Sequence, residues 1–323
     1  MPALPHIAIA LAFGFLASTA LAQPYPAKPV RLVLGFSPGG GTDLQARVIG
    51  QKLSEYWGHP VVVDNRVGAG GTIGADFVAK SPPDGYTILL GSVNQNAIAP
   101  AVFSKLPYNA SKDFASIGYV SYSSLVLNTH PSLPVKSVKE LTELARTRPG
   151  QISAASAGGN GTTHHLAIEM YMAATGVKII HVPYKGSGQS TTDLISGQVQ
   201  MAFDVLPPSI PYIRQGRLHA LAVTTLKRSS KVPEIPTMDE AGIKGFEIIN
   251  WYGFFAPAKT PPDVIAKING DINKALNDPS VARRLDEAGL EVGGGTPKAF
   301  DSYVKDEIVK FDKLVKAAGI KLD

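Results

Sequence analysis

The sequence predicts an α/β protein built from two units, and three observations lead to that prediction. Short apolar runs are followed by glycine-rich turns and then by segments with the apolar spacing of helices. The connections between these segments are short, which is typical of parallel sheets. The alternation restarts after residue 137, and 323 residues are too many for one typical core. We therefore expect two units, each a mainly parallel sheet flanked by helices.

The first unit has predicted strands at residues 30–34, 61–63 and 86–90, and its first helix is predicted at residues 43–57. A second helix should run to about residue 80. Each strand ends in a loop rich in glycine or polar side chains, at residues 36–43, 65–74 and 91–96. In open parallel sheets this carboxyl edge is where ligands bind.

The turn at residues 36–43, Phe-Ser-Pro-Gly-Gly-Gly-Thr-Asp, has two possible roles. Backbone N–H groups at the positive end of the following helix dipole can seat a small anion, such as a carboxylate or a phosphate. Alternatively, it is a tight strand-to-helix turn capped by Thr42 or Asp43. The spacing matches neither the dinucleotide-binding fingerprint nor the P-loop.

The second unit repeats the pattern after a less regular region at residues 109–124 that includes an apolar stretch at 117–120, with another at 125–127. The expected helices are residues 137–146, 163–174 and 189–196, and the expected strands are residues 152–155, 178–182, 199–203 and 218–224. A glycine-rich loop at residues 156–162 opens the helix at residue 163. After residue 231 we expect an aromatic strand at residues 248–255 and helices beginning at Pro261 or Pro262, at Pro279 and at Pro297.

The N-terminus has the form of an export signal. Residues 7–17 are an apolar run too short to span a bilayer, and Ala20-Leu21-Ala22 offers small residues for signal peptidase. We predict a signal peptide at residues 1–22, although its start lacks Lys and Arg. Export together with a complete absence of cysteine favours a bacterial periplasm. Lys and Arg are scattered and the net charge is only +5, so we expect neither nucleic-acid nor membrane binding.

The glycine-rich loops suggest a carboxylate site if the two units face one another. The loops at residues 37–42 and 68–72 would then form one side, and the loop at residues 156–162 the other. Each helix N-terminus contributes about 0.3–1 kcal/mol to binding an anion. Uncharged donors also avoid the desolvation cost of burying an arginine.

Seven ordered stretches, spread over nearly the whole mature chain, carry a resemblance to a known family. They are residues 36–43, 65–74, 83–87, 181–186, 221–224, 236–242 and 251–257, and the match extends to Ala318-Gly319-Ile320. In these stretches the chain resembles the periplasmic solute-binding proteins of the tripartite tricarboxylate transporter system, the Bug or TctC family. Each motif is weak alone, but the ordered set is specific.

The resemblance implies a two-lobed periplasmic binding protein, or Venus flytrap. Lobe one would comprise residues 23–122 plus 225–323, and lobe two residues 123–224. The implied ligand-binding residues are Phe36, Ser37, Gly39, Gly40, Thr42, Ala69, Gly70, Ser92, Asn94, Ser156, Gly161, Thr162 and Asp204. The loop at residues 156–162 is one glycine longer than the family pattern, which would shift its donors by one residue. The implied partners are a small organic acid or amino acid and a membrane permease, with the protein itself a monomer.

Several side chains allow two interpretations. Asp204 either contacts an amino or hydroxyl group of the ligand or accepts N–H bonds in the turn at residues 205–208. His164 and His165 point about 100° apart on a helix and cannot chelate one metal together, so we expect neither a metal nor a cofactor. We expect His165 to pack beneath the loop. The aromatic residues at 251–255 either form the core or line an aromatic pocket. Arg66 and Lys185 either steer anions or are solvated charges at the rim.

Three classes of function are compatible with an exported α/β protein: an enzyme, a transport receptor and a sensor. A hydrolase or lyase would need an activated nucleophile or base, and the chain has no cysteine and no Gly-x-Ser-x-Gly elbow. We therefore expect a binding protein rather than an enzyme, which captures a small carboxylate by lobe closure and delivers it to a transporter. A sensor that presents its closed form to a signalling partner remains the alternative. The identity of the acid stays open among citrate, dicarboxylates, amino acids, nicotinate-like acids and aromatic acids.

Overall fold

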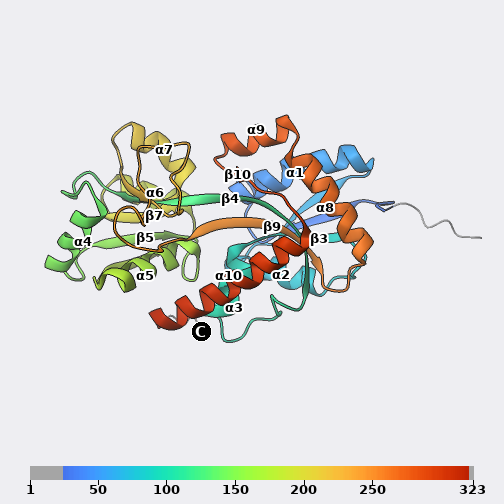
Figure 1. The fold of residues 1–323 in the computed structure, drawn as a ribbon, viewed down its shortest axis with the longest axis horizontal. Helices are drawn as coiled ribbons and strands as arrows, with labels where there is room; N and C mark the ends of the chain where they lie inside the picture. Colours follow the sequence, from blue (N-terminus) through green and yellow to red (C-terminus); the bar gives the residue numbers. More distant parts are fainter. Residues whose placement is uncertain (1–24, 320–323) are drawn as a thin grey trace, which may run out of the picture.

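The structure is a computed structural model that describes residues 25–319 (Figure 1). The predicted signal peptide and Ile320 lie outside the described residues. Two groups of helices flank a curled sheet, and the long strands β4 and β9 run between them (Figure 1). We call the part that carries β1, β2, β3 and β10 lobe one, and the part that carries β5 to β8 lobe two.

The strands follow the order β2-β1-β3-β9-β4-β7-β5-β6, and β8 and β10 also pair with β4. Their bounds are β1 Val30–Leu34, β2 Val61–Asn65, β3 Thr87–Ser92, β4 Phe114–Thr129, β5 Ser153–Ala157, β6 Ile180–Tyr184, β7 Met201–Val205, β8 His219–Val223, β9 Ile249–Pro257 and β10 Glu291–Val292.

The helices cover both faces of this sheet. Their bounds are α1 Gly41–Trp57, α2 Thr72–Ala79, α3 Ala99–Val102, α4 Val138–Thr147, α5 Thr163–Thr175, α6 Ser187–Ile195, α7 Leu206–Arg214, α8 Pro262–Leu276, α9 Pro279–Glu287 and α10 Pro297–Ala318. A 3₁₀ turn at Ala69–Gly71 precedes α2, and a π-helical segment at Asn94–Ile98 precedes α3. No helix within residues 25–319 is long and apolar enough to cross a bilayer.

Both lobes are α/β, as expected, but neither sheet is mainly parallel. β1 pairs in parallel with β2 and β3, and β5 pairs in parallel with β6 and β7. Both groups then meet antiparallel neighbours, because β9 pairs antiparallel with β3, and β4 pairs antiparallel with β7, β8 and β9. The reason is topological: β4 and β9 pass between the lobes in opposite directions, with Ser123 opposite Asn250.

Two local expectations were wrong. Most of the less regular region expected at residues 109–124, together with the apolar stretch at 125–127, forms one strand, β4, whose 16 residues reach into both lobes. Its register shifts between Ser116 and Gly118 and between Tyr119 and Ser121, and such bulges interrupt the alternation that marks a strand. The polar loop expected at residues 91–96 is instead the end of β3 followed by a π-helical turn.

The aromatic residues of β9 belong to the core, which confirms one of the two interpretations. Trp251, Phe254 and Phe255 are at most 1% exposed, and Tyr252 is 7% exposed. The Trp251 indole N–H donates to the buried Glu307 carboxylate of α10 at 3.0 Å. Because α10 packs against β4 and also against α5 of lobe two, it lies along both lobes (Figure 1).

Candidate ligand-binding cleft

A cavity of about 310 Å³ lies between the two lobes. It is bounded by the loop that precedes α2, the π-helical segment with α3, and the loop that precedes α5. The lining residues are Ala69, Gly70, Thr72, Asn94, Ala99, Phe103, Gly158, Asn160 and Gly161. None of these nine is charged, so the wall offers amides, hydroxyls and apolar surface rather than ion pairs.

The lobe-one side of the cavity is a strained turn. Ala69 has a φ of +46°, a left-handed conformation that costs a residue with a Cβ of order 1 kcal/mol or more. Gly71 has a φ of +95°, and a Cβ there would lie 3.2 Å from the Gln95 side chain. The Gly71 N–H donates to the Gly68 carbonyl at 2.9 Å, and the Thr72 hydroxyl donates to the Ala69 carbonyl at 2.9 Å. The turn is therefore fixed by its own hydrogen bonds while it presents Ala69 and Gly70 to the cavity.

The lobe-two loop is held from within by its hydroxyl groups. The Thr162 hydroxyl is within hydrogen-bond distance of the Ala157 and Gly159 carbonyls, at 3.2 and 3.0 Å. The Ser156 hydroxyl lies 3.3 Å from the Gly159 carbonyl and 2.6 Å from Nε2 of His181. Both hydroxyls therefore shape the loop, and Ser156 is fully buried.

Two stacked histidines support this loop from beneath. The rings of His165 and His181 lie 4.1 Å apart with an angle of 19° between their planes. The Gly161 N–H donates to Nδ1 of His165 at 3.1 Å, so that nitrogen carries no proton. Nε2 of His165 lies 3.3 Å from the Glu169 carboxylate. His165 is only 6% exposed, which confirms the expectation that it packs beneath the loop.

The pKa of His181 is lowered to about 4, mainly by burial and in part by the neighbouring His165. Its Nε2 can then accept the Ser156 proton or donate to the hydroxyl, depending on the tautomer. A second proton on the ring would place a charge against the His165 ring. The stacked geometry therefore favours a neutral His181 ring.

Asn94 connects the two lobes directly. Its side-chain Oδ1 accepts the Thr163 N–H, in the first turn of α5, at 3.3 Å. That N–H is one of the helix amides that the helix itself cannot satisfy. The adjacent Thr163 hydroxyl is buried and has no hydrogen-bond partner among the described residues. An unpaired hydroxyl therefore lies beside the contact between Asn94 and the start of α5.

Replacing Asn94 by alanine should favour the open form and weaken ligand binding. One neutral hydrogen bond contributes about 0.5–1.5 kcal/mol, so we expect a dissociation constant roughly 2- to 12-fold higher. Isothermal titration with an organic acid measures the affinity, and small-angle scattering of the unliganded protein measures the opening. Asn273→Ala, a change on α8, is the control. An unchanged affinity and radius of gyration in Asn94→Ala would show that this contact does not hold the lobes together.

The first glycine-rich turn lies beside the cavity rather than in its wall. Asn65 donates to the Phe36 carbonyl at 2.9 Å, and the Gly39 N–H donates to the Asp43 carboxylate at 3.0 Å. The Asp43 carboxylate is also bidentate with Arg47, and this bond is the main reason that its pKa falls to about 2. The N–H of Gly39 is thus occupied by a side chain of the helix that follows.

Asp204 is buried and its contacts are internal. It is 3% exposed, and it accepts the Val205 N–H at 2.8 Å and the Thr191 hydroxyl at 3.0 Å. Nε2 of His164 lies 3.7 Å from its carboxylate. Burial raises the pKa of Asp204, with His164 acting in the opposite direction, and burial lowers the pKa of His164. The bond to Val205 is the turn contact expected of the structural interpretation.

Of the thirteen predicted site residues, the cavity brings together Ala69, Gly70, Asn94 and Gly161. The others do not line it: Phe36, Ser37, Gly39, Gly40, Thr42, Ser92, Ser156, Thr162 and Asp204. Thr72, Gly158 and Asn160 were not singled out, although they lie in loops that were. No sequence pattern pointed to Ala99 and Phe103 as site residues, because their position in the cavity depends on the π-helical turn, which was not expected. Within the described part of the chain, no three His, Asp or Glu side chains cluster in a way that could hold a metal ion.

Comparison with known proteins points to one family. Residues 45–320 match the sequence model of the tripartite tricarboxylate transporter family receptor, TctC. The chain is 37% identical over 317 residues to Protein BugT of Bordetella pertussis, which covers 98% of this chain and 97% of BugT. It is similar to R. palustris Rpa4515 with adipate (38% identity, TM-score 0.84, 92% of this chain and 100% of that one). It is also similar to MatC (Rpa3494) from Rhodopseudomonas palustris with bound malate (31% identity, TM-score 0.80, 90% and 100%).

Proposed function

Because the chain belongs to the TctC family of tripartite tricarboxylate transporter receptors, we propose that it is a periplasmic solute-binding protein for a small organic acid. It would capture the acid between its lobes and deliver it to a membrane transporter, without chemical turnover. The observation that carries this proposal is the uncharged cavity between glycine-rich loops of both lobes. Two similar proteins hold adipate and malate, which makes these acids the first candidates.

The proposed mechanism is a population shift between open and closed forms. A ligand that touches residues 69–72 of lobe one and residues 158–161 of lobe two makes both sets of contacts only when the lobes are together. We place the lobe boundary where β4 crosses, near residues 122–123, and again near residues 224–225. The cross-lobe bond of Asn94 is the kind of contact that closure creates.

We propose that the carboxylate lies against the main-chain amides at the start of α5, close to Thr163. The helix dipole and the unsatisfied N-terminal amides favour an anion there. For the remaining predicted residues, including those of the first turn and Asp204, we propose that they contact the ligand or support the loops around it once the ligand is bound. The absence of charge in the cavity wall favours recognition by hydrogen bonds and shape.

A thermal-shift screen of the mature protein tests this function. At 100 times its dissociation constant, a true ligand should stabilise the protein by about 2.7 kcal/mol. Adipate, malate, aspartate, citrate, nicotinate and benzoate are compared with their amides at the same concentration and pH. Stabilisation by an acid and not by its amide supports a carboxylate receptor. Stabilisation by the neutral amides alone, or measurable conversion of the hit to a product, would contradict the proposal.

A further inference from the structure

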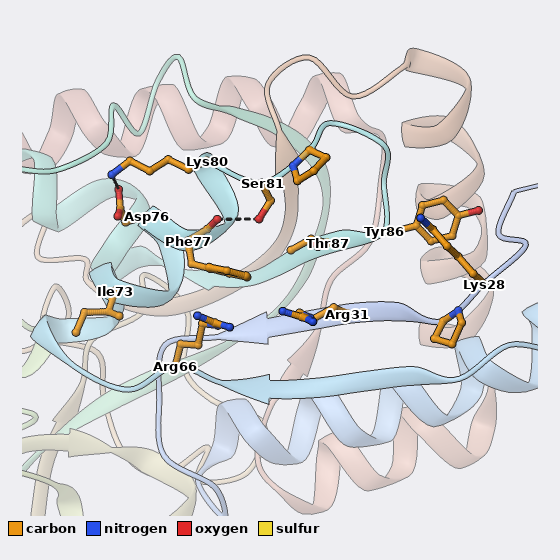
Figure 2. A pocket seen from close by; sticks show the side chains of 12 residues that line it. Lys28, Arg31, Arg66, Ile73, Asp76, Phe77, Lys80, Ser81, Tyr86 and Thr87 are labelled. Atoms are coloured by element: carbon orange, nitrogen blue, oxygen red, sulfur yellow. Dashed lines mark hydrogen bonds and ion pairs between the residues drawn. The ribbon is translucent and has the colours of Figure 1, made fainter.

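A second hollow, of about 760 Å³, lies on lobe one outside the cleft (Figure 2). Its floor carries Arg31 of β1, Thr87 of β3 and Arg66 just after β2, and α2 forms one wall. The charged side chains that line it are Lys28, Arg31, Arg66, Asp76 and Lys80. Four of these five are cationic, in contrast to the uncharged cavity between the lobes.

The two arginines converge on the same partners. Arg31 and Arg66 lie 3.8 and 3.0 Å from the single carboxylate of Asp64. Their guanidinium carbons lie 5.8 and 3.4 Å from the ring centre of Phe77 on α2, and Figure 2 shows both side chains beside that ring. One carboxylate cannot neutralise two guanidinium groups, and the arginine side chains remain 48% and 35% exposed. The pair therefore keeps one positive charge and free N–H donors toward the hollow.

The other two cations are already paired one to one. Lys80 lies 2.6 Å from Asp76, and Lys28 lies 3.8 Å from Asp84. The unneutralised charge of the hollow is thus concentrated at the two arginines. This localised charge differs from the diffuse lysine cluster that a lipid surface would require.

Exposed apolar side chains flank the arginines. Ile73, at the start of α2, lines the hollow and is 52% exposed. Val62 is 53% exposed and lies two residues before Asp64 on β2, hence on the same face of the strand. A partner that fits this surface has a carboxylate for the arginines and apolar side chains beside it.

Residues that line the hollow are close in sequence to residues that line the ligand cavity. Arg66 and Ile73 stand at the two ends of the strained turn that presents Ala69 and Gly70 to the cleft. A protein held at both ends of this turn would therefore contact the segment that lines the ligand cavity.

We propose that this hollow is a docking site for an acidic, partly apolar segment of a protein partner, with Arg31 and Arg66 as its anchors. The proposal rests on the proposed function in one respect, because a receptor must report closure to another protein. Carboxylates of the segment bind the arginine pair, and its apolar side chains lie on Ile73 and Val62.

A labelled peptide of four Glu-Val repeats, capped at both ends, tests the proposal by fluorescence anisotropy. The matched peptide of four Gln-Val repeats and phosphatidylglycerol vesicles are the alternative probes. We expect the Glu-Val peptide to bind, the Gln-Val peptide to bind at least about tenfold more weakly, and the complex to weaken as salt is raised. The double variant Arg31→Glu/Arg66→Glu should lose peptide binding by at least about tenfold.

The control variant is Lys139→Glu/Arg148→Glu, which makes the same charge change at two exposed positions of lobe two, one in α4 and one at its C-terminal cap. It should bind the peptide like the wild type. Arg31→Gln/Arg66→Gln removes the two charges without reversing them. It replaces Arg31→Glu/Arg66→Glu if the glutamate variant melts at a lower temperature than the wild type. Equal peptide binding by the arginine variants and the control overturns the proposal, and so does binding to the vesicles but not to the peptide. Adipate affinity, measured separately on each variant, should stay unchanged, so failure of the docking proposal is distinct from failure of the receptor function.

Discussion

Replacing Gly35 by alanine is expected to destabilise the protein strongly and to abolish ligand binding. Gly35 follows β1 and supports the turn that lines the cleft. A Cβ at this position would lie 2.3 Å from the Cα of Gly71 and 2.6 Å from its carbonyl oxygen. Both atoms are backbone, so no side-chain rotation relieves the clash. The strained turn at residues 69–71 would have to move away from the sheet.

We expect the free energy of unfolding to fall by about 3 kcal/mol, since overpacking against backbone is at the high end of such costs. For a chain of about 300 residues, that corresponds to a fall in melting temperature of roughly 5 °C. Calorimetry measures the melting temperature, and a titration with the best acid from the screen measures binding.

Gly41→Ala is the matched control for Gly35→Ala. Gly41 is the first residue of α1, and a Cβ there meets no atom within 4 Å. Alanine also has a higher helix propensity than glycine, so this variant should melt at or slightly above the wild-type temperature. A melting temperature of Gly35→Ala within about 2 °C of the wild type would show that the loop and strand are not in rigid contact.

The second prediction concerns acid pH and the histidine pair beneath the lobe-two loop. The pKa of His181 in the folded protein is about 4, below its ordinary value of 6.5. The unfolded chain therefore binds a proton more readily than the folded protein between these values. Stability should be fully present above pH 6.5 and should fall as the pH drops toward 4. The neutral ring is what the stacked geometry requires.

His181→Gln should flatten this dependence. Glutamine can offer its amide near the position of Nε2 and keep a contact with Ser156, but it does not titrate. Because His181 is partly exposed, we expect it to account for about 2 kcal/mol of the wild-type loss between neutral pH and pH 4.5. Urea unfolding at several pH values measures the free energy directly, and it avoids titration of the ligand's own carboxylate.

Other titrating groups also affect stability in acid, and one control variant helps to separate His181 from them. Burial also lowers the pKa of His164, so part of the acid loss should survive in His181→Gln. Asp204 acts in the opposite sense, because its raised pKa favours proton uptake by the folded state. His130→Gln, at a histidine bonded to Ser132, should keep the wild-type profile. If His181→Gln has the same pH dependence as the wild type, the pair does not control acid stability.

Much of the architecture was predictable from local pattern. Apolar runs and helical spacing located the parallel strands and most helices. The start expected at residue 137 coincides with the N-cap of α4, where the Ser137 hydroxyl accepts the Glu140 N–H. The pattern failed at β4, because bulges and serines hide a strand that reaches into both lobes. It also failed at residues 94–98, where a polar composition concealed a helical turn.

The sequence by itself determined the α/β class, the aromatic strand β9, the glycine-rich turns at strand ends and the family. These features can be predicted from local sequence patterns or from similarity to a known family, so predicting them does not require knowledge of distant contacts. Only the tertiary structure decided which loops share a cavity and which side chains meet there. Asn94 meets the start of α5 from 69 residues away, and the His165 and His181 rings meet through the pairing of β5 with β6. Such partners are set by packing across the sheet, which no local pattern encodes.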